Sequence, residues 1–246
     1  MPLYPDLRGR IALVTGGSRG IGAAICLLLA DAGADVAVNY RDRGDAAETV
    51  VAAIRAKGRR AVVVKADVSK ASEVAEMVRI VVETLGPITI LVNNAGIALV
   101  RGIENLTEKV FDETITVNLK SAFLCTQAVL PHMKKAQWGR IVNVTSGAAR
   151  GGGSVGPHYN ASKAGMEGLT RGYAARLVKE NITVNACAPS LIATDMMQQG
   201  LSSQASRIPV GRLGTAEECA EVVLMLIGNA YMTGQTVALS GGLSFL

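Results

Sequence analysis

The chain has 246 residues, of which 49% are hydrophobic and 18% are charged, and its formal net charge is +5. This length suits one α/β domain, and the low charge suits a parallel sheet that is buried on both faces. The basic residues are scattered and lack aromatic platforms, which argues against a nucleic-acid-binding protein. No apolar run reaches the roughly 18 residues of a membrane span and no signal peptide is recognisable, so we expect a cytoplasmic protein without a membrane partner.

Cysteine and histidine usage bears on metal binding and on the redox environment. The four cysteines are far apart in apolar surroundings, which indicates buried free thiols in a reducing compartment. No Cys-x-x-Cys pair exists and the chain has only two histidines, so no metal site is expected.

Short apolar runs alternate with helical patterns along the whole chain. The predicted strands are Ile11–Thr15, Val36–Asn39, Ala61–Val64, Ile90–Asn93, Ile141–Val144, Thr183–Cys187 and Thr236–Leu239. The predicted helices are Ile21–Ala32, Ala46–Ala56, Ser69–Leu85, Thr107–Met133 in two segments that meet near Thr116–Asn118, Tyr159–Val178 and Thr215–Ile227. This alternation predicts one α/β domain over residues 1–246: a Rossmann-type, doubly wound parallel sheet of about seven strands with helices on both faces.

The first predicted strand runs into a glycine-rich turn. Gly16, Gly20 and Gly22 follow a Gly-x-x-x-Gly-x-Gly spacing between a strand and a helix. Glycine permits a tight turn and a close backbone approach, and a helix N-terminus offers unpaired N–H groups to a pyrophosphate. The turn therefore predicts a dinucleotide site, with a purely structural turn as the alternative.

The end of the second predicted strand indicates which dinucleotide is bound. An acidic residue there would accept hydrogen bonds from the ribose 2′-hydroxyl of NAD. This chain instead has Asn39, Tyr40 and Arg41, and Arg19 lies inside the glycine turn. Two guanidinium groups suit a 2′-phosphate, so we predict NADP (NADPH); two unrelated surface arginines are the alternative.

A Ser-Tyr-Lys set lies further along the chain. Tyr159 stands four residues before Lys163 and thirteen after Ser146. Residues four apart share one face of a helix, and a nearby ammonium can lower a tyrosine pKa from roughly 10 by about 1–3 units. That spacing predicts a phenol able to pass protons near neutral pH, although a surface tyrosine beside a solvated lysine is the alternative.

One long irregular segment, Ser190–Gly214, follows the sixth predicted strand. A loop of this length in a compact domain is usually functional, so we predict a mobile substrate lid at about 190–214. Its methionines would adapt to varied apolar shapes, and its closure would exclude water from the reaction.

These motifs, with Asn93-Asn94-Ala95-Gly96, Asn118 and the run from Pro189 to Thr194, resemble the short-chain dehydrogenase/reductase family from about Leu7 to Leu243. The resemblance implies that Ser146 binds the substrate carbonyl oxygen and that Tyr159 donates its proton as hydride arrives. It also implies that Lys163 binds the nicotinamide ribose and lowers the Tyr159 pKa, and that Asn118 holds a water linked to Lys163. The cofactor contacts it implies are Gly16, Ser18, Arg19, Gly20, Ile21, Gly22, Asn39, Tyr40, Arg41, Asp67, Val68, Asn94, Ala95, Gly96, Tyr159, Lys163, Pro189, Ile192 and Thr194.

Three local features bear on the substrate pocket. Ser190 stands where the family has glycine, so its backbone must be one that a non-glycine residue can adopt. The loop from Ser146 to Gly156 is rich in glycine, which predicts a roomy or mobile pocket. His158 neighbours Tyr159 but points elsewhere on a helix, so we expect a pocket wall or a surface residue and not a catalytic base.

Within the family the sequence is most similar to the 3-oxoacyl-[acyl-carrier-protein] reductase type, through runs such as Thr-Gly-Gly-Ser-Arg-Gly-Ile-Gly and Ile-Pro-Val-Gly-Arg-Leu-Gly. Reductases of that type carry basic residues before the fifth and sixth strands, where this chain has Trp138 and Glu180. We therefore expect an NADP(H)-dependent reductase of a ketone or 3-oxoacyl-like small molecule, assembled as a homotetramer. The alternatives are a dedicated 3-oxoacyl-[acyl-carrier-protein] or acetoacetyl-CoA reductase, and a non-catalytic NADP-binding regulatory or scaffold protein.

Overall fold

The computed structural model describes residues 5–194 and 205–244. Its seven parallel strands form one sheet in the order β3-β2-β1-β4-β5-β6-β7, which confirms the predicted fold class. The strands are β1 (Ile11–Val14), β2 (Asp35–Tyr40), β3 (Ala61–Lys65), β4 (Ile90–Asn93), β5 (Gly139–Val144), β6 (Ile182–Pro189) and β7 (Thr236–Leu239). The helices are α1 (Gly20–Asp31), α2 (Gly44–Ala56), α3 (Ala71–Thr84), α4 (Glu108–Ile115), α5 (Ser121–Ala136), α6 (Pro157–Leu177) and α8 (Ala216–Gly228).

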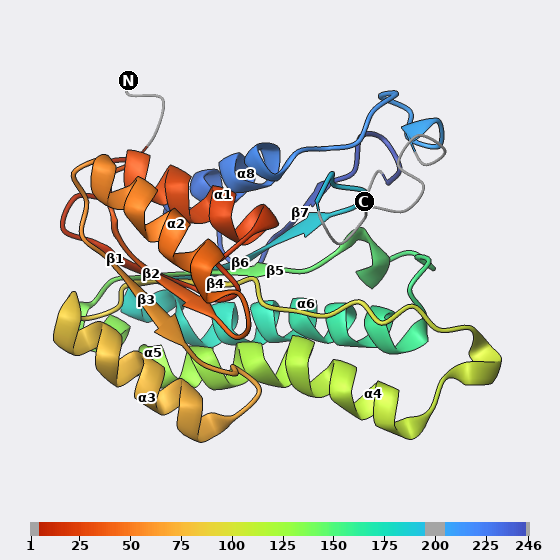
Figure 1. Ribbon diagram of the computed structural model, residues 1–246, viewed down its shortest axis with the longest axis horizontal. Coiled ribbons are helices and arrows are strands. Elements are labelled where there is room, and N and C mark those ends of the chain that lie inside the picture. Colours follow the sequence, from red (N-terminus) through yellow and green to blue (C-terminus); the bar gives the residue numbers. More distant parts are fainter. Residues whose placement is uncertain (1–4, 195–204, 245–246) are drawn as a thin grey trace.

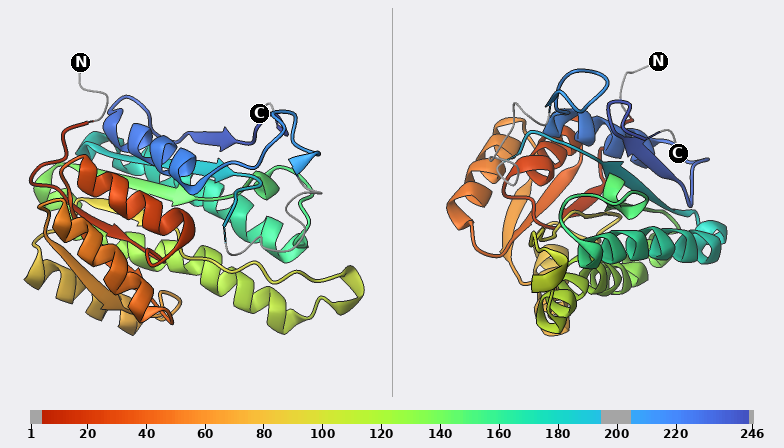
Figure 2. Two further views of the ribbon diagram at one scale, coloured as in Figure 1. Left: turned by 45° about the horizontal axis from the view of Figure 1, so that its top comes forward. Right: turned by 90° about the vertical axis from the view of Figure 1, so that its right-hand side faces the viewer.

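Helices cover both faces of the sheet. In Figure 1, α1, α2 and α8 lie on one face, and α3, α5 and α6 lie on the other. Each face has its own apolar core, one built around α1 and α8 and one around α3 and α5. Figure 2 shows the same layers from two further directions. Because both faces are covered, β1 is apolar throughout and β4 is apolar except for Asn93 at its end, without polar alternation.

The strand order reverses at β1, which pairs in parallel with both β2 and β4. The chain leaves the sheet in opposite directions on the two sides of this point, which opens a crevice at the carboxyl ends of the strands. The glycine turn after β1 and the Asn94–Gly96 segment after β4 therefore meet at one edge of the sheet.

The junction between α4 and α5 lies where the sequence predicted two helical segments to meet. The structure has a π-helical turn there, Thr116–Lys120, and Asn118 lies in its centre. A π turn inside a helix is rare and is often found at functional sites. Here it directs a fully buried amide toward the carboxyl edge of β4.

Most element boundaries differ from the predicted ones by one or two residues, and two of these differences have a local structural reason. Helix α3 begins at Ala71 and not at Ser69, because Ser69 donates its backbone N–H and its hydroxyl to Asp67 Oδ1. Strand β6 continues to Pro189, which occupies the last position of the strand, and the next residue, Ser190, donates its N–H to Leu239 O at 3.0 Å.

All four cysteines are buried and free, as predicted: Cys26, Cys125, Cys187 and Cys219. Burial raises the pKa of the Cys125 thiol to about 12, which leaves it unreactive near neutral pH. Within residues 5–194 and 205–244, no helix is both long enough and apolar enough to cross a membrane.

We expect Gly22→Ala to lower the free energy of unfolding by about 1–3 kcal/mol, as overpacking of a tight site does. A Cβ on Gly22 would collide with the Gly16 carbonyl oxygen and would lie 2.6 Å from Asn94 Nδ2. The matched control is Gly172→Ala, also within a helix, whose Cβ would lie 3.9 Å from Arg176 Nη1, the end of a flexible side chain. Urea denaturation checks both variants, and equal stabilities would contradict the collision.

Candidate active site

The centre of the site is a lysine buried between α6 and the end of β5. Lys163 Nζ donates a hydrogen bond to Val144 O at 2.8 Å and lies 3.7 Å from Met166 Sδ. The same nitrogen is 5.9 Å from the centroid of the Tyr159 ring, so the four-residue spacing does bring the two side chains together. An ammonium has three donors, so one N–H remains for a further acceptor.

Ser146 follows β5 and faces the same tyrosine. Its Oγ accepts a hydrogen bond from Ala148 N at 3.2 Å and so caps the 3₁₀ turn Gly147–Ala149. The Ser146 hydroxyl also hydrogen-bonds the Tyr159 phenol. Since the backbone N–H already occupies an acceptor position of Oγ, the hydroxyl proton is available for the phenol or for a carbonyl oxygen placed beside it.

The pKa of Tyr159 differs from the sequence expectation. Burial raises it above its ordinary value, and the hydrogen bond with Ser146 offsets only part of that effect. Burial also lowers the pKa of Lys163, to about 8. The prediction of a lowered tyrosine pKa was wrong for this structure because it counted the neighbouring charge and omitted desolvation, which acts on both groups.

Asn118 ties the π turn to the loop after β4. Its Oδ1 accepts from Ile97 N at 2.8 Å, and its Nδ2 donates to Ile97 O at 3.0 Å and to Ser162 Oγ at 3.1 Å. A Cβ on Gly96 would lie 3.2 Å from Asn118 Oδ1 and 3.6 Å from Lys163 Nζ. Asn118 thus lies beside the lysine, and it holds the Gly96 backbone close to both side chains.

The glycine turn has the shape that a pyrophosphate requires. Gly16 has φ +62°, a conformation that favours glycine, and a Cβ there would lie 3.1 Å from Ala95 Cα. Asn94 Nδ2 holds the turn by donating to Thr15 O and Gly16 O, both at 3.0 Å. Helix α1 starts beside it without a side-chain cap on its first N–H groups, which suits an anionic ligand.

Asn39 lies behind the glycine turn and not beside a ligand surface. Its Oδ1 accepts from Gly16 N at 3.1 Å, and its Nδ2 donates to Val64 O at 3.2 Å and Ala66 O at 3.1 Å. The side chain is buried. These bonds join the ends of β2 and β3 to the turn, so the geometry supports a structural role for this predicted cofactor residue.

Arg41, one of the two predicted phosphate partners, lies at the carboxyl end of β2. Its side chain is 52% exposed just beyond β2, and its Nε pairs with Asp42 at 2.8 Å. Asp67 is close enough to Arg41 for their charges to interact. Burial raises the pKa of Asp67, but the hydrogen bonds from Ser69 outweigh this effect and hold that pKa below its usual range. An exposed guanidinium beside the crevice can bind a phosphate.

The remaining predicted cofactor residues surround the same edge of the sheet. Half-buried or exposed around the crevice are Ser18, Arg19, Gly20, Ile21, Tyr40, Asp67, Ala95 and Gly96. Val68, Pro189 and Ile192 are buried, and Thr194 is half-buried. Thr194 Cγ2 would lie 3.5 Å from a Cβ on Gly20, so the segment after β6 crosses directly over the glycine turn.

Ser190 and the described ends of the expected lid meet at the end of β6. Among residues 5–194 and 205–244, only Gln137 and Asn181 are non-glycine residues with positive φ, so Ser190 adopts ordinary backbone geometry as required. Its Oγ packs against the Gly147 backbone, one residue from Ser146. Gly214 exchanges backbone hydrogen bonds with Leu191 and Ala193, which joins the two described ends of this segment. Residues 195–204 of the expected lid lie outside the described residues.

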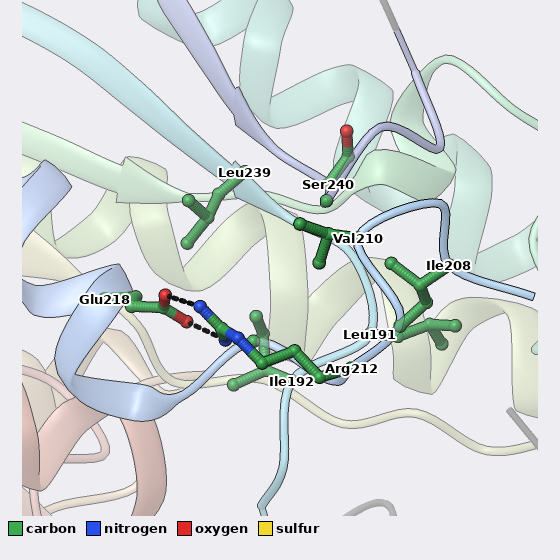
Figure 3. Close-up of a pocket in the computed structure, with 10 residues that line it drawn as sticks. Leu191, Ile192, Ile208, Val210, Arg212, Glu218, Leu239 and Ser240 are labelled. Carbon is green, nitrogen blue, oxygen red and sulfur yellow. Dashed lines mark hydrogen bonds and ion pairs between the residues drawn. The ribbon is translucent and has the colours of Figure 1, made fainter. Parts of the chain in front are cut away.

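A cavity of about 170 Å³ adjoins the place where Leu191 pairs with Gly214. Figure 3 shows its apolar lining from Leu191, Ile192, Ile208, Val210 and Leu239. Arg212 closes one side through two hydrogen bonds to Glu218, at 2.6 and 3.0 Å. The carbonyl oxygen of Leu239, which lines the cavity, accepts the N–H of Ser190. Ser190 in turn packs beside Gly147, so this one residue connects the cavity to the loop that follows Ser146.

The sequence did not predict that the glycine-rich loop is held by α6, and of the two positions expected for His158 only the surface one is wrong. Asn160 Nδ2 donates to Gly151 O at 2.9 Å and Gly152 O at 2.7 Å, so the loop is tethered to α6. His158 is fully buried, which rules out the expected surface position, and its Nε2 lies 2.9 Å from Leu99 O. A buried histidine at the start of α6 therefore contacts the loop after β4 through its Nε2.

Known proteins are similar to this chain in sequence and in architecture. The sequence profile of the short chain dehydrogenase family matches residues 10–205. The chain is 42% identical, over 94% of its length and 98% of the relative's, to 3-oxoacyl-[acyl-carrier-protein] reductase FabG of Staphylococcus epidermidis. A short chain dehydrogenase from Burkholderia cenocepacia, in complex with NADP, has a TM-score of 0.91 and 38% identity over 96% of this chain and 98% of its own. A blue fluorescent protein from a metagenomic library, in complex with NADPH, has a TM-score of 0.92 and 35% identity over 98% of this chain and 100% of its own.

We expect Lys163→Met to raise the free energy of unfolding at pH 7, because the lysine pKa falls from 10.5 to about 8 on folding. Between those values the unfolded chain binds more protons, so wild-type stability rises with pH by at most about 1.4 kcal/mol per unit, and the burial penalty below pH 8 is roughly 3 kcal/mol. The difference in the free energy of unfolding between Lys163→Met and wild type, measured by denaturation, should therefore shrink from pH 8 to pH 10.5. A difference that does not depend on pH would contradict a desolvated ammonium.

Proposed function

The chain belongs to the short-chain dehydrogenase/reductase family, and from this we infer that it is an NADP-dependent oxidoreductase that interconverts a carbonyl group and an alcohol. One structural observation supports the proposal most directly: Ser146, Tyr159 and Lys163 converge at the end of β5, on the same sheet edge as the glycine turn. This arrangement places a proton donor beside a dinucleotide crevice.

In the proposed reaction, bound NADPH supplies the hydride, and the protein orients the carbonyl and supplies the proton. Ser146 donates a hydrogen bond to the carbonyl oxygen, which increases the electrophilicity of the carbon. Tyr159, whose pKa is raised by burial, is protonated at neutral pH and so acts as the general acid. Lys163 has one donor left for a ribose hydroxyl, and Asn118 keeps the Gly96 backbone beside it.

Cofactor selection in this proposal falls to Arg41 and Arg19. Both lie at the side of the crevice where β2 ends and α1 begins, and no carboxylate occupies positions 39–41 to accept a ribose hydroxyl. The pyrophosphate would bind at the first turn of α1, and Asp67 and Val68 would border the adenine.

The charges before β5 and β6 favour a small carbonyl compound over a carrier protein as the substrate. Lys134 pairs with Glu180 at 2.9 Å, which neutralises the lysine that the patch would present. Trp138 lies against Arg10 and Arg140, whose Cζ atoms are 3.8 and 4.4 Å from its ring centroid. An acidic carrier protein would find less free positive charge on this surface than the resemblance alone implies. Turnover of acetoacetyl-CoA without turnover of the carrier-protein thioester would agree with this choice.

Three further features complete the proposal. The segment at about 190–214 acts as a substrate lid, since its two ends are joined by the Leu191–Gly214 pairing and its described residues line part of the apolar cavity. The protein is a cytoplasmic homotetramer; Phe111 on α4 and Phe123 on α5 are exposed apolar side chains on helices that a single copy leaves uncovered. A non-catalytic scaffold is disfavoured because all four expected catalytic residues are present and converge.

We expect Tyr159→Phe to reduce kcat for NADPH-dependent ketone reduction by about 10²–10⁴, the usual contribution of a general acid, with little change in NADPH affinity. Tyr173→Phe is the matched control, because its phenol accepts from Gln127 at 2.8 Å on an exposed part of α6. A panel of ketones, keto esters and acetoacetyl thioesters, followed by NADPH absorbance, gives both rates. Retention of a tenth of the wild-type rate would remove Tyr159 from the acid role.

We expect Arg41→Asp to shift the ratio of kcat/KM for NADPH over NADH by roughly 10–100-fold, because a hydrogen bond to a charged group contributes about 1.5–3 kcal/mol. The new carboxylate would also accept from a ribose hydroxyl. Arg41→Met is the control: it should weaken NADPH use without improving NADH use. An unmoved ratio would place the 2′-phosphate elsewhere.

A further inference from the structure

The glycine-rich loop after Ser146 is attached to α6 at two separate places. Asn160 Nδ2 binds the carbonyl oxygens of Gly151 and Gly152, at 2.9 and 2.7 Å. Arg150 Nε donates to Glu167 Oε2 at 3.0 Å. Both attachment points are on the helix that carries Tyr159, so the loop cannot move away from the helix without breaking one of these contacts.

Glu167 is an unusual residue to find at its position. Its side chain is only 6% exposed, and its Oε1 is buried without a hydrogen-bond partner. The second nearby cation, Arg171, comes no closer than 3.8 Å. A buried carboxylate is unfavourable unless a cation compensates it closely, and Arg150 supplies that compensation. The ion pair therefore holds the loop more firmly than two exposed charges would.

The spacing of these residues links the ion pair to the reacting groups. Tyr159, Lys163 and Glu167 are each four residues apart on α6 and so lie along one side of the helix. On the facing segment, Ser146 and Arg150 are also four residues apart. Ser146 pairs with Tyr159, and Arg150 pairs with Glu167, so two connections join the same loop to the same helix face.

We propose that Arg150, Glu167 and Asn160 are positioning residues that fix Ser146 against Tyr159 and thereby determine which carbonyl substrates the enzyme accepts. The inference rests on the proposed roles of Ser146 and Tyr159. The loop has no side chain at Gly152, where a Cβ would meet nothing within 4 Å, so its backbone borders open space. Because Ser146 is the residue proposed to bind the carbonyl oxygen, a loop that these attachments hold in one position restricts how a bulky carbonyl compound can reach it.

The test compares full-length Arg150→Met, Arg150→Lys and Glu167→Gln with wild type, using NADPH and a matched pair of small and bulky 3-keto esters. For Arg150→Met and Glu167→Gln we expect kcat for the small ester to fall about tenfold while the KM for NADPH stays unchanged, as a slightly misplaced donor would cause. The bulky-to-small ratio of kcat/KM should rise by a similar factor. Arg150→Lys keeps the charge and should recover part of both effects.

A second readout separates positioning from a loss of folding. If Ser146 tilts away, Tyr159 loses the hydrogen bond that lowers its pKa, so the ascending limb of the pH profile for alcohol oxidation should move to higher pH in Arg150→Met. Arg171→Met is the matched control, since Arg171 faces the same carboxylate without holding the loop; it should change neither the substrate ratio nor the pH profile.

The outcomes distinguish this inference from the proposed function. A wild-type enzyme that reduces no carbonyl compound with NADPH overturns both. An active wild type whose substrate ratio and pH profile are the same in Arg150→Met and Glu167→Gln overturns the positioning role alone. If Arg150→Met does not fold, Glu167→Gln, which keeps the shape of the side chain, decides by the same ratio and profile.

Discussion

The site depends on one contact, the hydrogen bond from the buried ammonium of Lys163 to the carbonyl oxygen of Val144. It joins the last residue of β5 to the helix that carries Tyr159, so the sheet edge and the phenol keep a fixed relation. The partners of this ammonium are a carbonyl oxygen and a thioether sulfur, and neither neutralises its charge. The lysine consequently releases its proton more easily than usual, and the fold accepts a less stable core to keep it there.

The same edge of the sheet is assembled by side-chain amides that bind backbone atoms. Asn94 holds the glycine turn, Asn118 holds the loop after β4, and Asn160 holds the loop after β5. Asn118 uses both its acceptor and its donor, whereas Asn94 and Asn160 each donate to two carbonyl oxygens. Each side chain can therefore fix a loop whose own backbone hydrogen bonds are incomplete. Irregular segments at the carboxyl ends of the strands thereby obtain defined positions without adding regular structure.

The sequence predicted the strands and helices well, but it did not predict how deeply individual side chains are buried or which distant residues they contact. The bounds of β4 and β7 were predicted correctly from their short apolar runs, and β4 is apolar almost throughout because both of its faces are covered. The Tyr159–Lys163 pair followed from helix spacing. The pKa direction of Tyr159 did not, because burial depends on what the rest of the chain packs against it. The Arg150–Glu167 pair, seventeen residues apart, follows no helical or strand period, so no pattern in the sequence could have indicated it.

The hydrogen bonds that Asn39 makes to the glycine turn and to the end of β3 restrict which substitutions could change the cofactor preference of this protein. Its Nδ2 faces the carbonyl oxygens of Val64 and Ala66, so an aspartate at this position would bring a carboxylate oxygen against two acceptors. An evolutionary path through Asn39→Asp would therefore loosen the turn before it gained a ribose contact. A change toward another dinucleotide is better made at the exposed positions that follow Asn39, such as Arg41, where a charge can change without disturbing the strand ends.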